Sequence, residues 1–282
     1  MAAHGVASLK ADIVIVGCGD LGTALARQCQ SHQLSVLGLR RHPQGEDFPC
    51  ISADITEVES LSVIAKTQAK VLVYCVAATE QSDANYQQQY VQGLRNTLQA
   101  CQALASMPLI IFVSSTRMYG QDSSQALDEQ SVPLNSDFGG QRLMQAEALL
   151  EQIPHAVALR LTGIYGPGRQ RMLQWASNPA LWPADNKWTN RIHRDDAVGF
   201  IWHLIQAHLS GQAIQRLYIV TDSQPTPMYD VLHYFAQRLG VQQALPNKPL
   251  SGGRFFSNQR MLSTGYQLRY PSYLSGGYPL PN

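Results

Sequence analysis

Short runs of β-branched and aliphatic residues alternate with amphipathic stretches over the first 160 residues. The apolar runs predict strands at 12–17, 34–39, around Ile51, and at 71–76, 109–114 and 156–161. The amphipathic stretches predict helices at 21–31, 61–68, 86–104 and 142–152. Alternation of this length indicates an α/β fold with a doubly wound parallel sheet, and nearly continuous apolar strands agree with burial on both faces.

The alternation of apolar runs and amphipathic stretches ends after residue 162. Residues 163–192 are rich in Gly and Pro and contain three of the four tryptophans, a helix and a strand return at 195–209 and 216–220, and one clear helix follows at 228–239. We therefore expect a larger domain of residues 1–162 and 193–221. A smaller, irregular domain of residues 163–192 and 222–282 is expected to bind the substrate.

The first predicted strand runs into a glycine-rich turn that opens the first predicted helix. The turn reads Gly17, Cys18, Gly19, Asp20, Leu21 and Gly22, which is a G-x-G-x-x-G pattern. Between a strand and a helix these glycines permit a tight turn, a close approach of backbone N–H groups to a pyrophosphate, and close helix–strand packing. This context predicts a Rossmann-type dinucleotide-binding domain.

The end of the second predicted strand bears on the choice of cofactor. An NAD-selective site usually has an acidic residue there, which binds the ribose 2′-hydroxyl, whereas this strand ends in Arg40 and Arg41. Two guanidinium groups would attract a 2′-phosphate, so NADP(H) is favoured over NAD(H). An exposed basic turn is the alternative, and Asp20 in the loop weakens the preference. Asp54 and Ile55, after the third strand, are placed to bracket the adenine.

The net charge of +1 conceals an asymmetry along the chain. Residues 1–159 carry 9 basic and 15 acidic side chains, and residues 160–282 carry 12 and 5. The basic second part favours an anionic small-molecule substrate. The overall excess is too small for a general nucleic-acid binder, and no apolar run is long enough to cross a membrane. Five cysteines without a Cys-x-x-Cys pair indicate reduced thiols in a cytoplasmic protein, without a metal site.

Several motifs in the same order resemble those of the extended or atypical short-chain dehydrogenase/reductases, the NAD(P)-dependent epimerase/dehydratase family. The matching segments are the glycine-rich turn, Asp54-Ile55, Val76-Ala77-Ala78, the Phe-Val-Ser-Ser-Thr-Arg-Met-Tyr-Gly of 112–120, the Arg-Leu-Thr-Gly-Ile-Tyr-Gly-Pro-Gly of 160–168, and the Ile-His-Arg-Asp-Asp of 192–196. Within the family the chain resembles small bacterial members of the YeeZ type.

The resemblance implies roles for further residues. It implies an oxidoreductase, epimerase or dehydratase that acts on an anionic, nucleotide-linked sugar, with Ser115 polarising the substrate oxygen. The residues implied to contact the cofactor beyond the glycine-rich turn, the arginines and Asp54-Ile55 are Ala77, Ala78, Ser114, Gly163 and Ile164. The residues expected to contact the substrate are Arg117, Phe138, Arg169, Arg191 and His193. Arg169 and Arg191 flank a Trp-rich segment, and arginines beside aromatic faces suit a phosphate joined to a planar base, with a role as rim residues as the alternative. For His193 the alternative is a positional, hydrogen-bonding role.

The chain departs from the family at its acid/base pair, Tyr-x-x-x-Lys. The corresponding positions are Phe138 and Arg142, which keep the four-residue spacing of one helix turn. Phenylalanine has no proton to donate, and arginine is a poor proton relay because its pKa lies above about 12. We expect Arg142 to bind ribose hydroxyls, and Tyr165 is the expected substitute for the lost tyrosine. A packing role for Tyr165 is the alternative.

Two classes of function remain open from the sequence. The favoured one is a catalytic oxidoreductase, epimerase or dehydratase. The competing one is a non-catalytic NAD(P)-binding regulator or redox sensor that kept the fold and lost the acid/base pair. A homodimer through the helices at 86–104 and 142–152 is expected only by analogy with the family.

Overall fold

The computed structural model describes residues 9–134 and 137–278 of the chain. Contacts divide it into two compact units. The first comprises Met1–Met118, Ser136–Leu159 and Val198–Leu217, and the second comprises Tyr119–Asn135, Arg160–Ala197 and Tyr218–Asn282. Each unit is described separately below.

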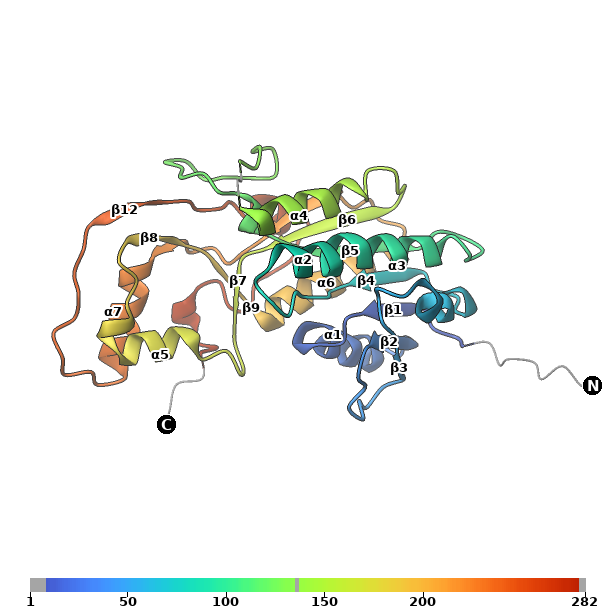
Figure 1. Ribbon diagram of the computed structural model, residues 1–282. Coiled ribbons are helices and arrows are strands. Elements are labelled where there is room, and N and C mark those ends of the chain that lie inside the picture. Colours follow the sequence, from blue (N-terminus) through green and yellow to red (C-terminus); the bar gives the residue numbers. More distant parts are fainter. Residues whose placement is uncertain (1–8, 135–136, 279–282) are drawn as a thin grey trace, which may run out of the picture. The chain divides into compact units, whose positions relative to one another are not determined.

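A seven-stranded sheet of order β10-β6-β5-β4-β1-β2-β3 is the centre of the fold (Figure 1). Its strands are β1 (Ile13–Val16), β2 (Val36–Arg40), β3 (Cys50–Ser52), β4 (Val71–Tyr74), β5 (Leu109–Ser115), β6 (Ala156–Leu161) and β10 (Leu217–Val220). β1 pairs in parallel with β2 and with β4, and every residue of β1 is buried. The predicted doubly wound parallel sheet is confirmed.

Helices cover both faces because the chain leaves β1 in two directions. It first moves outward through α1 (Asp20–Ser31) to β2, and later returns to β4 and continues through α3 (Gly93–Cys101) to β5. Right-handed crossovers place these two helices on opposite faces. The 3₁₀ segment η1 (Val58–Lys66) packs against α3, and α4 (Phe138–Ala148) packs against the residues just before α3, so both lie on the α3 side. α6 (Arg194–Leu209) meets the end of α1 through Trp202 and His32, whose rings are 4.5 Å apart.

The helix after β4 is not uniform. It starts as α2 (Asp83–Tyr86), widens into a π-helical segment, η2 (Gln87–Gln92), and continues as α3. Gly93 is required at its packing surface, because a Cβ there would lie 2.4 Å from both Ile55 and the Tyr74 hydroxyl oxygen. The Tyr74 hydroxyl donates a hydrogen bond to the Gln89 carbonyl inside the widened turn.

The second unit contains short strands and its own core. β7 (Gly163–Tyr165) pairs in parallel with β9 (Arg191–His193), and β8 (Asn186–Thr189) lies between β11 (Thr226–Pro227) and β12 (Leu250–Gly253). α5 (Arg171–Ser177) and α7 (Met228–Arg238) pack together. Trp182 is buried in this core against Tyr229, with ring centroids 5.2 Å apart.

Three sequence expectations need correction. α4 begins at Phe138 rather than at residue 142, because Asp137 caps it by accepting a hydrogen bond from the Gly140 N–H. The helix expected at 61–68 is a 3₁₀ segment that already begins at Val58. β7, β8, β9, β11 and β12 were not expected, because they are short and none of them contains the continuous apolar run that marks β1, β4 and β10.

Candidate functional site

The glycine-rich turn in the first unit leaves room for a ligand at one glycine and none at the other two. Gly17 has a φ of +96°, and a Cβ there would lie 2.7 Å from the Val76 backbone nitrogen. A Cβ at Gly22 would lie 2.3 Å from the Gly17 carbonyl oxygen, so only glycine lets α1 approach β1 this closely. At Gly19 a Cβ would meet nothing within 4 Å, so the backbone is open on that side.

The open side coincides with the beginning of α1. Gly19 is the N-cap residue of this 12-residue helix. Because glycine has no side chain, Gly19 forms no side-chain hydrogen bond with the first N–H groups of the helix. Such N–H groups, together with the helix dipole, bind pyrophosphate oxygens. The residues therefore fit a dinucleotide, with Gly17 to Gly22 holding its pyrophosphate. Cys18 points away from that side, because its thiol is buried and donates to the Ile15 carbonyl at 3.6 Å.

The two arginines after β2 differ in their partners. The Arg40 guanidinium forms an ion pair with Glu46, 2.7 Å from Nη1 to Oε1, and the Glu46 side chain is only 6% exposed. Arg41 is exposed. A 2′-phosphate at this position would therefore face a carboxylate as well as two cations.

Asp54 and Ile55 form the turn between β3 and η1. Asp54 Oδ1 accepts hydrogen bonds from the backbone N–H and the hydroxyl of Thr56. Burial alone would raise the pKa of Asp54, but the Thr56 hydrogen bonds and the charges of Arg41 and His42 outweigh it, and the pKa is lowered. Ile55 packs against α3, and its carbonyl accepts a hydrogen bond from Asn96.

The loop after β4 and the end of β5 carry the next predicted residues. The Ala78 N–H donates to the Tyr90 hydroxyl at 3.4 Å, and Ala77 precedes it in the same loop. Ser114 is buried, and its hydroxyl donates to Glu147 on α4 at 2.6 Å, so this side chain supports the fold. Ser115 is half-buried, and its oxygen accepts the Arg117 N–H at 3.1 Å. Its own proton can then be donated to a substrate oxygen.

Arg117 is held by Gln81 in the loop before α2, by Tyr86 at the end of α2, and by Asp137 at the N-cap of α4. Its Nε and Nη2 atoms donate to the two oxygens of Asp137 at 3.0 and 2.7 Å. Nη1 donates to Gln81 at 2.7 Å and to the Tyr86 hydroxyl at 2.6 Å. The guanidinium carbon also lies 4.8 Å from the Tyr86 ring centroid and 5.0 Å from that of Phe138.

The two residues at the positions of the Tyr-x-x-x-Lys pair face different neighbours. The Phe138 ring stands perpendicular to that of Tyr86, with centroids 5.4 Å apart. Arg142, one turn later, forms a two-pronged ion pair with Asp83 through Nε and Nη2, at 2.7 and 2.8 Å. This pair ties α4 to α2. The predicted binding of ribose hydroxyls by Arg142 stays a prediction.

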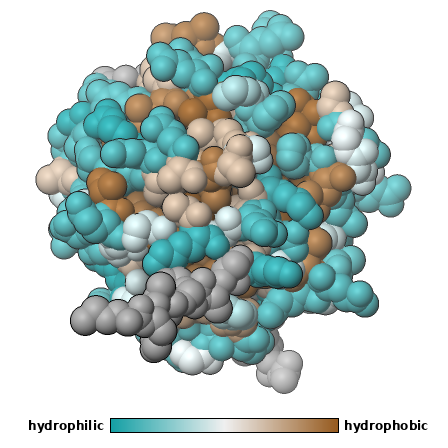
Figure 2. Space-filling model, turned by 90° about the vertical axis from the view of Figure 1, so that its right-hand side faces the viewer, coloured by the Kyte–Doolittle hydropathy of each residue, from teal (hydrophilic) through white to brown (hydrophobic). Residues whose placement is uncertain are grey.

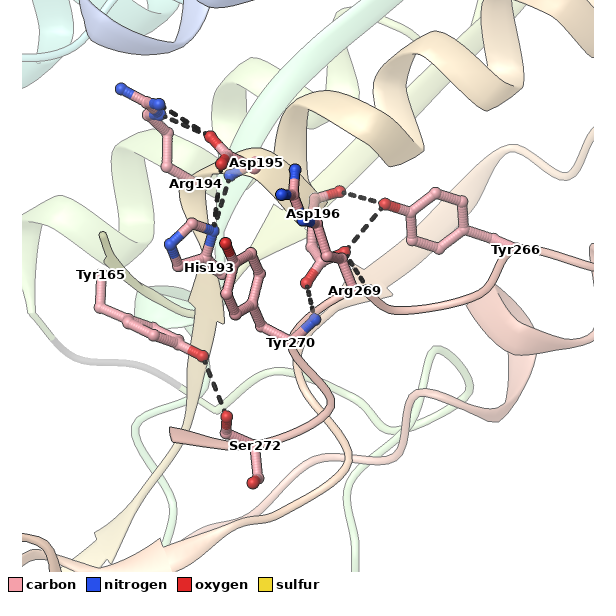
Figure 3. Close-up of polar contacts among 9 residues, drawn as sticks. All are labelled: Tyr165, His193, Arg194, Asp195, Asp196, Tyr266, Arg269, Tyr270 and Ser272. Carbon is pink, nitrogen blue, oxygen red and sulfur yellow. Dashed lines mark hydrogen bonds and ion pairs between the residues drawn. The ribbon is translucent and has the colours of Figure 1, made fainter. Parts of the chain in front are cut away.

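The second unit places His193 among tyrosine rings (Figure 3). The ring lies between Tyr165, with centroids 5.0 Å apart, and Tyr270, at 3.7 Å. Its Nδ1 atom accepts the backbone N–H of Asp195 at 3.1 Å, and burial lowers its pKa despite the nearby carboxylates of Asp195 and Asp196. His193 thus acts as a structural acceptor at the start of α6.

Asp196 joins α6 to the C-terminal segment of the same unit. One of its oxygens accepts the Arg269 N–H at 2.7 Å and the Tyr266 hydroxyl at 3.1 Å, and the other accepts the Tyr270 N–H at 2.8 Å (Figure 3). The Tyr165 hydroxyl donates to the Ser272 carbonyl at 3.3 Å. Burial raises the pKa of Tyr165, and its ring stacks on Tyr278, which agrees with the packing alternative for this residue.

Arg191 is buried within the second unit. Its Nη2 donates to Thr189 at 2.5 Å, and the guanidinium lies 5.1 Å from the Tyr273 ring centroid. The nearby Asp222 is 1% exposed, and burial raises its pKa to about 7 although Arg191 lowers it. Arg191 Nη1 and Asp222 Oδ2 are both buried without a hydrogen-bond partner among the described residues.

The remaining predicted residues of the second unit lie on β7 and beyond it. Gly163 and Ile164 belong to β7, with Gly163 exposed and Ile164 half-buried. Arg169 precedes α5, and its backbone N–H donates to the Gly166 carbonyl at 3.1 Å.

Sequence reasoning missed three residues of these clusters, namely Gln81, Tyr86 and Asp222. Gln81 and Tyr86 lie 36 and 31 residues before Arg117, so no spacing rule joins them. One signal was present in the sequence. Gly139 and Gly140 in the first turn of a helix indicate a close approach, and a Cβ at Gly139 would lie 2.5 Å from the Arg117 guanidinium carbon.

The sheet, the glycine-rich turn and the uncapped start of α1 define a dinucleotide-binding protein of the Rossmann type. The model of the NAD dependent epimerase/dehydratase family matches residues 13–219. The chain belongs to this family. Its members are NAD-dependent enzymes, which supports the enzymatic alternative that the sequence favoured.

Solved structures agree with this assignment. A candidate NAD-dependent epimerase/dehydratase from Methylobacillus flagellatus is 44% identical over 94% of this chain and 96% of its own, with a TM-score of 0.86. A UDP-N-acetylglucosamine 4-epimerase from Bacillus cereus is 17% identical over 93% and 92%, with a TM-score of 0.73. A UDP-glucose 4-epimerase from Brucella ovis, solved with NAD, is 15% identical over 94% and 95%, with a TM-score of 0.75. None of the curated proteins matches the chain.

Within residues 9–134 and 137–278, every helix is too short or too polar to cross a bilayer. Figure 2 shows one face of the molecule, on which hydrophilic residues predominate and hydrophobic residues occur in small groups among them.

Proposed function

We propose that this protein is a cytoplasmic NAD(P)-dependent oxidoreductase, epimerase or dehydratase that acts on an anionic, nucleotide-linked sugar. The supporting observation is the open backbone at Gly19 beside the uncapped start of α1, in a chain of this family. The substrate class is supported by the UDP-sugar epimerases of the same fold and by the +7 balance of residues 160–282. The bound dinucleotide supplies hydride transfer.

Ser115 is proposed to donate a hydrogen bond to the substrate oxygen and so to polarise it. Its hydroxyl oxygen already accepts the Arg117 N–H, which fixes its position at the end of β5. The substrate contacts are proposed at the predicted positions Arg117, Phe138, Arg169, Arg191 and His193.

Transfer of a label tests the class of reaction. Purified protein is incubated with NADPH or NADH deuterated at C4 and with oxidised nucleotide-linked sugars, and with NAD⁺ or NADP⁺ for UDP-glucose and UDP-N-acetylglucosamine. Deuterium in a sugar product, or conversion of a UDP-sugar into its epimer, is expected. A protein that binds the dinucleotide but gives neither product on any of these probes would be the non-catalytic regulator instead.

We further propose a preference for NADP(H) through Arg40 and Arg41. Because the Arg40 guanidinium already forms an ion pair with Glu46, the preference is expected to be modest. NADPH is expected to bind about threefold to tenfold more tightly than NADH, as measured by titration calorimetry. Glu46→Gln removes the competing carboxylate and is expected to widen the difference, and Arg40→Ala with Arg41→Ala is expected to abolish it. Equal affinity of the parent for the two dinucleotides contradicts the preference.

A homodimer through α4 and the helix at 83–101 is also proposed, by analogy with the family. Met144 on α4 is 39% exposed, as a side chain at such an interface would be in a separate protomer. Light scattering coupled to gel filtration gives the mass directly, and Met144→Glu is expected to shift it from dimer to monomer.

A further inference from the structure

The first unit contains a phenol and a guanidinium in direct contact, beside the position where the family has its acid/base tyrosine. Arg117 Nη1 donates to the Tyr86 hydroxyl oxygen at 2.6 Å. The Tyr86 ring is perpendicular to that of Phe138, with centroids 5.4 Å apart. A phenolic oxygen is therefore present close to the position from which the family's own phenol is missing.

The contact is built from several parts of the chain. Asp137 receives two N–H groups of Arg117 and at the same time caps α4, so the guanidinium is fixed to the first turn of that helix. Gly139 makes the space for it, because any Cβ there would lie 2.5 Å from the guanidinium carbon. Gln81 Oε1 accepts from Nη1 at 2.7 Å and from the Tyr86 hydroxyl at 3.4 Å. The phenol thus has its oxygen facing a cation and its proton facing a neutral amide.

We propose that Tyr86 is the acid/base group of the reaction and that Arg117 is its positioning residue; this rests on the proposed function. In the oxidation of a sugar alcohol, the O–H bond breaks and its proton passes to the Tyr86 phenolate oxygen. The C–H electron pair leaves as hydride to the bound dinucleotide, and a C=O bond forms. In the reduction the same proton returns from Tyr86 to the carbonyl oxygen.

Arg117 makes this proton transfer feasible. When Tyr86 gives up its proton, the negative charge on its oxygen lies 2.6 Å from a guanidinium nitrogen. Hydrogen bonds to a charged group are stronger than those to a neutral one, so the Arg117–Tyr86 hydrogen bond strengthens while the proton is being transferred. The Tyr86 ring is 6% exposed, whereas the Arg117 side chain is 29% exposed, so the hydroxyl end of this buried ring lies beside the more open group.

The other polar groups around Phe138 are committed to different contacts. Arg142 is bound in two places to Asp83. The Tyr90 hydroxyl accepts the Ala78 N–H, and burial raises its pKa. Asp137 caps α4 while it holds Arg117, whose hydrogen bonds lower the pKa of this carboxyl. Compared with Arg142, Tyr90 and Asp137, Tyr86 combines a proton that it can donate with a neighbouring guanidinium that stabilises the negative charge left on its oxygen.

The test compares Tyr86→Phe with a matched tyrosine elsewhere. Tyr234 on α7 also accepts a hydrogen bond from an arginine, Arg238, at 3.3 Å, and it lies in the second unit. With UDP-glucose or UDP-N-acetylglucosamine as the probe, Tyr86→Phe is expected to lower kcat about 100-fold to 1,000-fold, with KM changed less than threefold. Tyr234→Phe is expected to leave kcat unchanged. Both changes keep the ring, so thermal unfolding by circular dichroism should stay within 2 °C of the parent.

Arg117 is tested by its conservative variant and by pH. Arg117→Lys keeps a cation and is expected to retain at least a tenth of the parent's kcat. Arg117→Met is expected to lower kcat as much as Tyr86→Phe does, and to move the limb of the kcat–pH profile to higher pH. A purely structural role would lower both variants alike without moving the limb.

A second readout does not depend on turnover. Binding of NAD⁺ brings a positive charge to the site, and in weakly buffered alkaline solution with a pH indicator the parent is expected to release more protons than Tyr86→Phe. The parent and Tyr86→Phe should bind NAD⁺ equally well, because Tyr86 is proposed to move a proton rather than to hold the dinucleotide.

The outcomes separate the two proposals. A parent that turns over the probe while Tyr86→Phe keeps its kcat overturns the assignment of Tyr86 and leaves the proposed function standing. A parent without hydride transfer on any probe overturns both.

Discussion

Two arginines of this protein lie against tyrosine rings at similar distances and yet are in opposite environments. Arg117 is 4.8 Å from the Tyr86 ring, is partly exposed and has partners for Nε, Nη1 and Nη2. Arg191 is 5.1 Å from the Tyr273 ring and 3% exposed, and its Nη1 has no hydrogen-bond partner among the described residues. An arginine satisfied at the surface can be removed at little cost to folding. A buried arginine is expected to cost more to remove, because its charge interacts with the neighbouring buried groups without screening by water.

The largest expected effect separates the two arginines by stability. Arg191→Leu is expected to lower the free energy of unfolding by about 3–5 kcal/mol, because it removes a large buried side chain together with its hydrogen bond to Thr189 and its contact with the Tyr273 ring. Arg117→Leu is expected to cost about 1 kcal/mol or less, since its ion pair with Asp137 is partly exposed, while it lowers kcat about 100-fold to 1,000-fold. Urea unfolding followed by circular dichroism measures both. Equal losses for the two variants would remove the distinction.

The buried carboxyl beside Arg191 gives the next effect, which depends on pH. Its ordinary pKa of 3.8 is raised to about 7 in the folded protein, so between these values the folded state holds a proton that the unfolded state has lost. Stability should therefore fall as the pH rises from 3.8 to about 7, by about 4 kcal/mol, and stay level above it.

Asp222→Asn should remove this slope and leave the variant more stable than the parent at pH 8. Asp230→Asn, at an exposed position of α7, serves as the control and should keep the parent's slope. Urea titrations at a series of pH values measure the effect, and a parent whose stability rises across this interval would show that Asp222 is ionised when folded.

The smallest expected effect concerns the space that Arg117 occupies. Gly139→Ala places a methyl group 2.5 Å from the guanidinium carbon, so Arg117 must move away from Asp137 and Tyr86. We expect kcat to fall about tenfold, or about 1.4 kcal/mol, while helix propensity raises stability by up to about 1 kcal/mol. In the Arg117→Met background the same change should have no further effect on kcat. Additive losses would mean that Gly139 acts through another contact.

The sequence predicted the first unit well because its strands are apolar runs and its helices are amphipathic. The four-residue apolar run of β1 and the glycines at 17, 19 and 22 carry their own periodicity and spacing, and both are local properties of the chain. α4 was placed four residues late because Gly139 and Gly140 are poor helix formers, and tertiary contact with Arg117 outweighs that preference.

The partners of the candidate site were beyond the reach of sequence reasoning. Arg117 was expected to meet the substrate, but nothing local shows that Gln81 and Tyr86, before and at the end of α2, contact it from more than 30 residues away. The strands of the second unit were missed for a related reason. β8 and β12 gain their pairing only when residues about 64 positions apart come together, and their composition is polar or glycine-rich.

The π-helical segment Gln87–Gln92 has a consequence for how this chain is compared with its relatives. A π turn bonds each residue to the fifth one along rather than to the fourth, so it holds about one residue more than an α turn. A single extra residue in a regular helix would rotate one end by about 100° against the other. The bulge absorbs that rotation locally, with Tyr86 before it and Gly93 after it. An ungapped alignment that runs through this helix would then be out of step on one side, and Tyr86 has to be matched to relatives by superposition rather than by counting from Gly93.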